Sequence, residues 1–349
     1  MQISHFDFEL PRELIAQTPA SPRDKSKLLY VPVKGTLKDM TMRDLPNLMN
    51  PEDVLVINNT RVIPARLFGK IGNNGAKIQI TLHHFEESNF WRAFSKPAKK
   101  IKVNDKIIFD ENFCAVVIEK LQGGEIKISF NLKGEPFKSY LNKIGIMPMP
   151  PYIKRDDLGE QSDWDNYQTT FASRDGAVAC PTAGLHFTPN LIKNLTKYNI
   201  KIIPITLHVG AGTFLPVKTM NTESHKMHAE WGEITPESAA LINATKKKGG
   251  RVIAVGTTVL RLLETSATQD GSVLPYSGNT DIFISPGYQF KAANTLLTNF
   301  HLPKSTLLIM LDAFLGERWK SLYKEALDQN YRFLSFGDAM LVQRRFLGN

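Results

Sequence analysis

Polar side chains that can donate, accept or transfer protons are concentrated in residues 279–304, between short apolar runs. Asp281 precedes the run 282–284, which predicts a strand, and a Ser-Pro-Gly sequence predicts the turn that ends it. A second run, 296–298, leads directly into Asn299, Phe300 and His301. Open α/β sheets place their sites on such loops at strand ends. The density of polar groups therefore indicates a site, although each residue alone is more typical of an ordinary turn.

Two further histidines lie beside glycine-containing turns. His186 belongs to the segment CPTAGLHFT, and His208 follows the apolar run 200–207 and precedes Gly-Ala-Gly. Glycine lets a backbone approach a ligand closely, and an imidazole titrates near neutrality, so either ring is a candidate general base. The alternative is that one ring only hydrogen-bonds in the core. His301 is the third candidate.

The sequence Gly256-Thr257-Thr258 joins a predicted strand, 251–255, directly to a predicted helix, 259–265. Backbone N–H groups and two hydroxyls at a helix start suit a carboxylate or a phosphate. The spacing matches neither G-x-G-x-x-G nor a P-loop, so it predicts neither a dinucleotide nor a nucleoside triphosphate.

Two other patterns are weak evidence for chemistry. Cys180 could be a nucleophile if a base lay beside it, but its spacing from His186 does not require this, and a free cysteine is more often a small buried hydrophobe. His225, His228 and Glu230 form a His-x-x-His pattern without further ligands. We therefore expect no metal.

The composition is typical of a globular protein: 349 residues, 42% of them hydrophobic. Single cores stop growing near ~250 residues, so two domains are expected. The longest apolar run ends at Asp312, well short of the ~18 residues of a membrane span. The amino terminus lacks a secretory pattern, and two cysteines are too few for a disulfide framework. These features predict a cytoplasmic location without a membrane segment.

The net charge of +9 is concentrated in one part of the chain. Residues 61–150 hold 15 Lys and Arg against 8 Asp and Glu, a surplus of seven positive charges. This surplus is either an ordinary solvated surface or a strip that faces phosphates. The lysines that would form such a strip are Lys96, Lys99, Lys100, Lys102 and Lys106.

The same segment has the pattern of a small barrel. Six β-like runs are separated by turn residues, at 62–71, 76–85, 90–95, 105–109, 114–121 and 125–130. A stiff linker rich in proline follows at 147–151. Because small barrels can bind polynucleotides, the basic surplus makes this one a candidate platform for nucleic acid, by analogy.

Alternating strand and helix patterns occupy the rest of the chain. A buried strand at 53–58 ends in Thr60 and Arg61, which are site candidates for that reason. Thr188 can cap a helix at 189–198, and a last long helix, 305–328, contains Gly316, where it could bend. Asp338 follows a turn glycine near the carboxyl terminus.

The chain closely resembles the S-adenosylmethionine:tRNA ribosyltransferase-isomerase family of queuosine biosynthesis. The matching segments, in order, are FDFELPRELIAQTPASPRDKSKLL, VLVINNTRVIPARL, YQTTFA, CPTAGLHFT, LHVGAGTF, MHAEW, RVIAVGTT, TDIFISPGYQF, LLTNFHLPKSTLLIML and YRFLSFGDAMLV. They cover both ends of the chain and leave mainly the barrel interior unmatched. The family pattern usually has alanine at the position of Cys180, and Ser-Val-Arg where this chain has Val259, Leu260 and Arg261.

The resemblance implies an enzyme that transfers and isomerises the ribosyl part of S-adenosylmethionine onto 7-aminomethyl-7-deazaguanine in tRNA. The products are epoxyqueuosine in tRNA, adenine and methionine. S-adenosylmethionine is then a co-substrate, and neither a prosthetic group nor a metal is implied. An RNA-binding protein without catalysis is the alternative.

This chemistry needs a base at the sulfur-activated C5′ hydrogen, an acid near adenine, and groups that hold the carboxylate and the ribose. The candidates are His186 or His208 as base, Asp338 or Asp281 at the ribose or adenine, Gly256, Thr257, Thr258 and Arg261 at the carboxylate, and Asn299, His301, Lys304, Thr60, Arg61, Lys96, Lys99 and Lys100 at the nucleotide or tRNA.

The resemblance also implies a mixed α/β core made from both chain ends, with the antiparallel six-stranded β-barrel inserted in it. The expected division is core at 1–60, barrel at 61–150 and core at 151–349. We expect a monomer.

Overall fold

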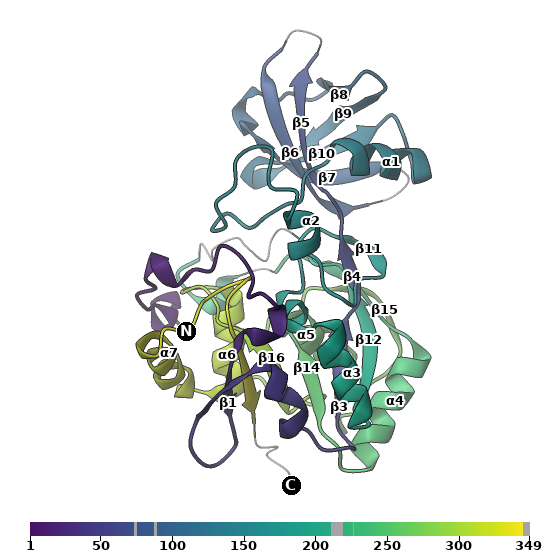
Figure 1. The fold of residues 1–349 in the computed structure, drawn as a ribbon. Coiled ribbons are helices and arrows are strands. Elements are labelled where there is room, and N and C mark those ends of the chain that lie inside the picture. The colour runs from purple at the N-terminus through teal and green to yellow at the C-terminus, as the bar shows by residue number, and fades with distance from the viewer. Residues whose placement is uncertain (73–74, 87–88, 211–218, 226, 345–349) are drawn as a thin grey trace.

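The computed structural model describes residues 1–349 except 73–74, 87–88, 211–218, 226 and 345–349. A barrel stands above a larger layered core, and two short strands, β4 (Thr60–Val62) and β11 (Arg174–Ala177), lie between them (Figure 1). Strands of the core precede and follow the barrel in sequence. The fold is a mixed α/β core with an inserted antiparallel barrel, as expected.

A mixed sheet, nine-stranded within the described residues, forms the centre of the core. Its middle strands run parallel: β12 (Lys201–Leu207), β3 (Val54–Asn58), β14 (Val252–Val255) and β16 (Thr295–Asn299). One side is extended by β13 (Glu230–Ile234) and β15 (Tyr276–Thr280), and the other by β17 (Ala339–Gln343), β1 (Lys27–Val31) and β2 (Lys38–Thr41). The carboxyl ends of the four parallel strands therefore meet at one edge, where α/β sheets place their ligands.

Alternate residues of the parallel strands pack against opposite layers. Val54 and Val56 belong to the core cluster formed with α4 (Pro236–Lys247), α5 (Thr257–Ser266), α6 (Thr306–Leu315) and α7 (Arg318–Asp328). Leu55 and Ile57 belong to a second cluster, formed with η4 (Met42–Leu48) and α3 (Pro189–Lys197). Both faces of β3 are buried, which is why its sequence is continuously apolar.

The barrel closes in the order β10-β7-β6-β5-β8-β9, with antiparallel pairs throughout. Apolar side chains fill its interior, among them Leu67, Ile80 and Ile128. The strands are β5 (Arg66–Ile71), β6 (Lys77–Phe85), β7 (Phe90–Lys96), β8 (Lys106–Asp110), β9 (Phe113–Lys120) and β10 (Glu125–Phe130). Helix α1 (Gly134–Ile144) packs Phe137 and Leu141 against this interior.

Short helices complete the chain. They are η1 (Ile3–Phe6), η2 (Arg12–Leu14), η3 (Arg23–Lys25), η5 (Ala98–Lys100), η6 (Gln122–Gly124), α2 (Asp163–Asn166), η7 (Thr182–His186) and η9 (Thr222–Ser224). Where the chain passes from core to barrel, the Gln168 amide accepts from Val62 N at 2.9 Å and donates to Val62 O at 3.0 Å. This paired contact ties the α2 segment to β4.

One expectation from the sequence is wrong, and one helix was not anticipated. The run 282–284 is not a strand, because the chain leaves the sheet after β15, whose polar sequence YSGNT hid it. Helix α1 was not expected. The predicted helix 305–328 is indeed interrupted at Gly316, whose φ of 65° separates α6 from α7, and Thr188 caps α3 by accepting from Leu191 N at 3.1 Å. No helix among the described residues is both long and apolar enough to cross a membrane.

Candidate active site

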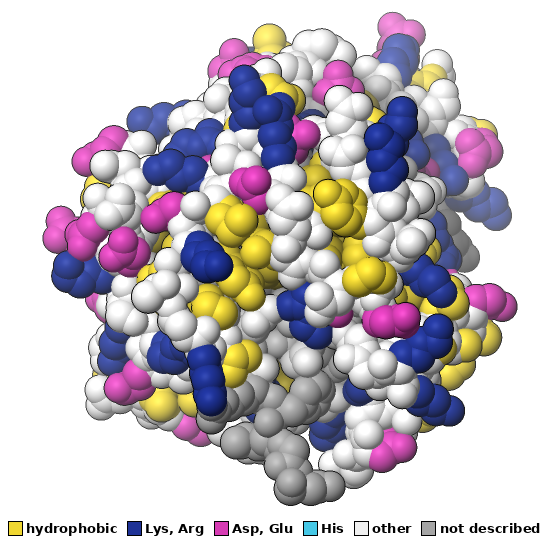
Figure 2. All heavy atoms as spheres, turned by 60° about the horizontal axis from the view of Figure 1, so that its bottom comes forward, with side chains coloured by type: hydrophobic (Ala, Val, Ile, Leu, Met, Phe, Trp, Pro, Cys, Tyr) yellow, Lys and Arg dark blue, Asp and Glu magenta, His cyan; other side chains and the backbone are white. Residues whose placement is uncertain are grey.

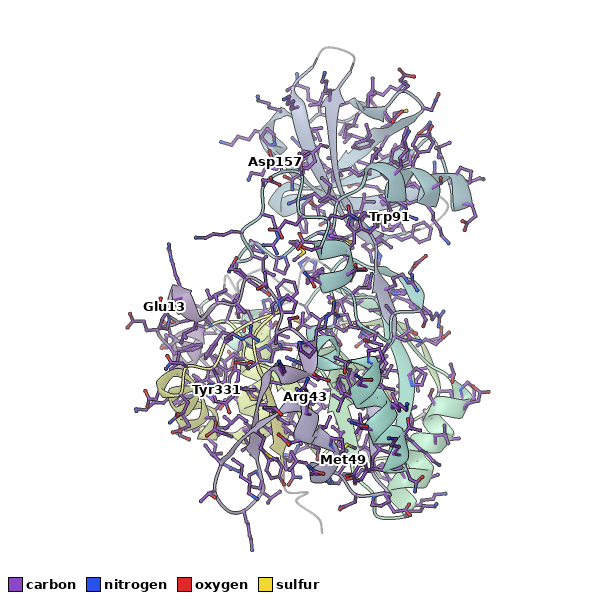
Figure 3. All side chains as sticks on the ribbon, in the orientation of Figure 1. Glu13, Arg43, Met49, Trp91, Asp157 and Tyr331 are labelled. Atoms are coloured by element: carbon purple, nitrogen blue, oxygen red, sulfur yellow. The ribbon has the colours of Figure 1, made fainter. Side chains whose placement is uncertain are left out.

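A cavity of about 1420 Å³ lies where the barrel meets the core. The barrel and α1 contribute Trp91 and Phe137, and the core contributes Arg174, His208 and Trp231. Trp91 sits at the end of the barrel that faces the core (Figure 3). Because pockets for drug-sized ligands usually measure ~300–1,000 Å³, this cavity has room for more than one small ligand group.

His208 is held on the wall of this cavity by contacts from three elements. It follows the last residue of β12, and its Nδ1 lies 2.8 Å from Thr60 Oγ1. Its ring stacks on Trp231, with 5.2 Å between ring centroids and 23° between planes. A Cβ on Gly176, whose φ is 148°, would lie 2.8 Å from three ring atoms. Strand β11 can therefore pass beside the ring only with glycine at this position.

The surroundings of His208 keep its ring neutral. Burial, with a smaller effect of the Arg174 guanidinium, lowers the pKa of His208 to about 4. A neutral imidazole has one unprotonated nitrogen, which can accept a proton. Charged groups of both signs line the cavity around it: Arg23, Arg61, Lys133, Lys138 and Arg174, and Glu86, Asp165, Asp175 and Glu230.

A smaller cavity, of about 70 Å³, lies at the carboxyl ends of β14 and β16. Gly256, with a φ of 96°, turns β14 into α5, and Thr257 and Thr258 follow on the cavity wall. Thr257 and Thr258 are each 7% exposed. His301 also lines this cavity. The helix start and two hydroxyl-bearing residues therefore line one small space, which suits an anionic group.

His186 lies in the interior, and within the described residues both of its ring nitrogens have partners. Nδ1 is 2.8 Å from Ser26 Oγ and Nε2 is 3.2 Å from Asn299 Nδ2. Burial, with the charges of Arg332 and Arg23, lowers its pKa to about 3. It lines neither cavity. His301 is also buried, which lowers its pKa to about 3, and its Nε2 is 3.1 Å from Thr298 Oγ1.

Two other predicted residues, Asp338 and Asn299, are engaged in structural contacts, and a third, Asp281, lies on the surface. Asp338 accepts from the backbone of Lys27 at 2.9 Å and of Arg332 at 2.8 Å, so it holds β1 beside the turn before β17. Asn299 accepts from Thr182 at 3.2 Å and donates to Leu334 O at 3.1 Å, and it lines the smaller cavity. Asp281 is exposed and lines neither cavity.

Three predicted cations are paired with carboxylates, and one of them is Arg61, whose Nε lies 3.6 Å from Asp175. Arg261 is buried, with Nη1 donating to Glu230 and Nε donating to Ile282 O at 3.3 Å. Glu230 Oε1 in turn accepts from Gly210 N at 2.8 Å, so this pair connects α5 to the wall of the larger cavity. Lys304 Nζ lies 2.6 Å from Asp7 on the surface.

The predicted nucleic-acid residues fall into two groups. Thr60 lies behind His208, and Arg61 lines the larger cavity. Lys96, Lys99 and Lys100 are exposed at the other end of β7 from Trp91, which is ~17 Å away by strand rise.

On the face at the opposite end of the molecule from the barrel, basic and acidic side chains are interspersed (Figure 2).

Other residues of the larger cavity were not anticipated from the sequence. Arg174 and Trp231 each contact the surroundings of His208, with the Arg174 guanidinium 5.4 Å from the Trp231 ring centroid. Arg174 lies two residues after the segment YQTTFA, and Trp231 is the last residue of the segment MHAEW. The sequence pattern of β11 and β13 did not indicate either residue, because both come close to His208 only through the packing of these strands.

The two weak patterns in the sequence gain no support. Cys180 is buried, which raises the pKa of its thiol. Within the described residues, no group of three or more His, Cys, Asp or Glu is arranged to hold a metal ion.

Comparison with known proteins identifies relatives along the whole chain. Residues 3–342 match the family model of the queuosine biosynthesis protein. An S-adenosylmethionine:tRNA ribosyltransferase-isomerase of Parvibaculum lavamentivorans is 48% identical over 98% of this chain and 99% of its own length. One from Beijerinckia indica is 49% identical over 99% and 97%. The crystal structure of an S-adenosylmethionine tRNA ribosyltransferase from Thermotoga maritima is 33% identical, with a TM-score of 0.56, over 97% of this chain and 100% of that one.

Proposed function

The chain belongs to the queuosine biosynthesis protein family, and from this premise we propose that it is an S-adenosylmethionine:tRNA ribosyltransferase-isomerase. It transfers and isomerises the ribosyl part of S-adenosylmethionine onto 7-aminomethyl-7-deazaguanine in tRNA, with release of adenine and methionine. S-adenosylmethionine is a co-substrate here. We further propose that the protein acts on tRNA as a monomer in the cytoplasm.

The reaction begins with loss of a hydrogen from C5′, which the positive sulfur acidifies, so the site needs a base at this carbon. His208 is our candidate. The observation that supports it most is its position: a neutral ring, held by Thr60 and Trp231, on the wall of a cavity with room for more than one small ligand group. His186 is less suited, because its two ring nitrogens already have partners in the interior.

The methionine carboxylate would bind at the start of α5. The N–H groups that follow Gly256, with the hydroxyls of Thr257 and Thr258, offer donors to an anion, and the helix dipole favours negative charge there. This cavity of about 70 Å³ has room for a carboxylate but not for an adenosyl group. The adenosyl part would accordingly extend toward the larger cavity.

The tRNA would approach from the open side of the larger cavity. Arg61 and Arg174 lie there beside Lys133 and Lys138, at the junction of barrel and core. Such cations neutralise phosphates and release counterions, so binding should weaken steeply with salt. The modified base would enter the cavity, as nucleotides do in enzymes that act on a base.

The activity is tested by measuring adenine release from S-adenosylmethionine labelled in the adenine ring. Release should require tRNA that carries 7-aminomethyl-7-deazaguanine, and the same tRNA with unmodified guanine is the matched control. Tight tRNA binding without adenine release would favour the alternative, an RNA-binding protein without catalysis. The names of the relatives support the enzyme.

A further inference from the structure

Thr60 lies directly behind the ring of His208 and is completely buried. Its Oγ1 is 2.8 Å from His208 Nδ1 and 3.5 Å from the carbonyl oxygen of Arg174. A threonine hydroxyl has one proton to donate and lone pairs that accept. The contacts of Thr60 therefore constrain which nitrogen of His208 carries the proton of the neutral ring.

Two proton arrangements fit these distances. In the first, Nδ1–H donates to Thr60 Oγ1, and the Thr60 hydroxyl donates to Arg174 O. Both donors then have acceptors, and Nε2 keeps its lone pair. In the second, Thr60 donates to Nδ1 and the ring proton sits on Nε2. Among the described residues, the Nε2–H group then has no hydrogen-bond acceptor, and Arg174 O no longer accepts from the Thr60 hydroxyl. The first arrangement adds one long contact of 3.5 Å, from the buried Thr60 hydroxyl to Arg174 O, and this contact favours it.

We propose that Thr60 is a positioning residue that holds His208 as the Nδ1–H tautomer, with the lone pair of Nε2 available to remove a proton from the substrate. The inference rests on the proposed function, which makes His208 the base. Thr60 itself touches no substrate. Its role is to accept one hydrogen bond from the ring and to donate its own hydroxyl proton to a carbonyl, so that the reactive nitrogen is fixed before substrate binds.

Thr60 can act in this way because its own position is rigid. The side chain of Asn58, at the end of β3, accepts from Thr60 N at 3.1 Å and from Leu207 N at 3.1 Å, and donates to Leu207 O at 2.9 Å. One buried amide therefore fixes Thr60 and the residue before His208 together. The hydroxyl and the imidazole come from different strands, and Asn58 sets the spacing between them.

The first test reads the tautomer directly in the unaltered chain. With ¹⁵N-labelled histidine, the ring signals of His208, identified by their loss in His208→Asn, should show a protonated Nδ1 and an unprotonated Nε2 at pH 7. Protonation of Nε2 in the free protein would overturn the inference. This measurement requires no substitution at Thr60, so a folding defect cannot obscure it.

The second test compares Thr60→Val with Thr60→Ser. Valine keeps the shape but removes the hydroxyl, and we expect C5′ hydrogen exchange to slow about 10- to 100-fold, with the affinity for S-adenosylmethionine retained. Serine should restore most of the rate, and valine should also abolish the preference for the Nδ1–H form. An unchanged exchange rate in Thr60→Val would overturn the inference. If His208→Asn keeps its exchange rate, the assignment of the base fails instead, whatever the tautomer.

Discussion

The surroundings of His208 and His186 differ in one respect that decides what each ring can do. Both rings are neutral, because burial lowers the pKa of His208 to about 4 and that of His186 to about 3. His186 uses both nitrogens in hydrogen bonds within the core, whereas His208 uses Nδ1 and lines a cavity with the rest of its ring. A buried histidine becomes a candidate base when one nitrogen has no protein partner and the substrate can reach it.

Replacement of each histidine by asparagine gives the largest expected effect. His208→Asn removes the proton acceptor, so adenine release and C5′ hydrogen exchange should fall ~100-fold or more, the usual scale of a general base. Binding of S-adenosylmethionine and tRNA should persist. Exchange at the original rate in this variant would contradict the assignment.

His186→Asn is the matched control, because it removes a ring from the interior. It leaves Ser26 and Asn299 without their ring partner, which should lower the free energy of unfolding by about 1–3 kcal/mol. The rate per folded molecule should stay close to that of the original chain. A rate loss of ~100-fold with full stability would transfer the role of base to His186.

Gly176→Ala tests the wall of the cavity without touching the imidazole chemistry. The added Cβ would lie 2.8 Å from three atoms of the His208 ring, so either the ring or the backbone of β11 must shift. We expect C5′ exchange to slow about 10- to 100-fold, because a misplaced base loses most of its benefit. Gly35→Ala is the control for backbone strain, since Gly35 also has positive φ, 101°, with open space around its Cβ position. Equal effects of both variants would show that strain, and not the ring, is responsible.

The comparison also shows how far sequence reasoning reaches. The six barrel strands and the parallel strands were predictable, because period-two patterns and continuous apolar runs follow directly from burial on one face or on both. Thr60 and His208 were both singled out as polar groups at strand ends. Their contact was not predictable, since it joins positions 148 residues apart and depends on the pairing of β3 with β12.

The roles of other candidates depended on packing in the same way. Asp338 and Arg261 looked available in sequence, but one closes a turn and the other is bound by Glu230. The converse holds for Gly176, which had no motif around it and is required only because the His208 ring lies against β11. Residue type predicts what a group can do, and tertiary contacts decide whether it is free to do it.

The pH dependence of stability gives a second test of the interior position of His186. The pKa of His186 is about 3 in the fold and ~6.5 in the unfolded chain, so the unfolded chain binds more protons between these values. The stability gained by keeping His186 neutral is fully present above pH ~6.5 and is lost as the pH falls toward 3.

Urea unfolding of the original chain and of His186→Asn at several pH values measures this contribution. The difference in the free energy of unfolding between them should be largest above pH 6.5 and should narrow steadily toward pH 4. A constant difference across this range would mean that folding does not lower the pKa of His186.

The exposed lysines of the barrel lie on a part of the surface that is remote from the cavity. Neutral replacements of Lys96, Lys99, Lys100 and Lys102 should lower tRNA affinity and reduce the slope of log K against log salt, by up to ~0.9 for each phosphate that is no longer neutralised. The catalytic rate at saturating tRNA should not change, because these residues lie at the far end of β7 from Trp91. An unchanged salt slope would confine tRNA binding to the cavity side, where Arg61 and Arg174 lie.

Cys180→Ala should have the smallest effect, because Cys180 resembles His186 in being held in the interior. The cysteine is 5% exposed, and burial raises the pKa of its thiol, so the thiolate that a nucleophile requires is disfavoured. Adenine release should therefore stay within about twofold of the original rate, far from the ~100-fold expected when a catalytic group is removed. A loss on that scale, with S-adenosylmethionine binding retained, would mean that the thiol attacks the substrate, and the search for the reactive centre would then move from the large cavity to the small one that Cys180 lines.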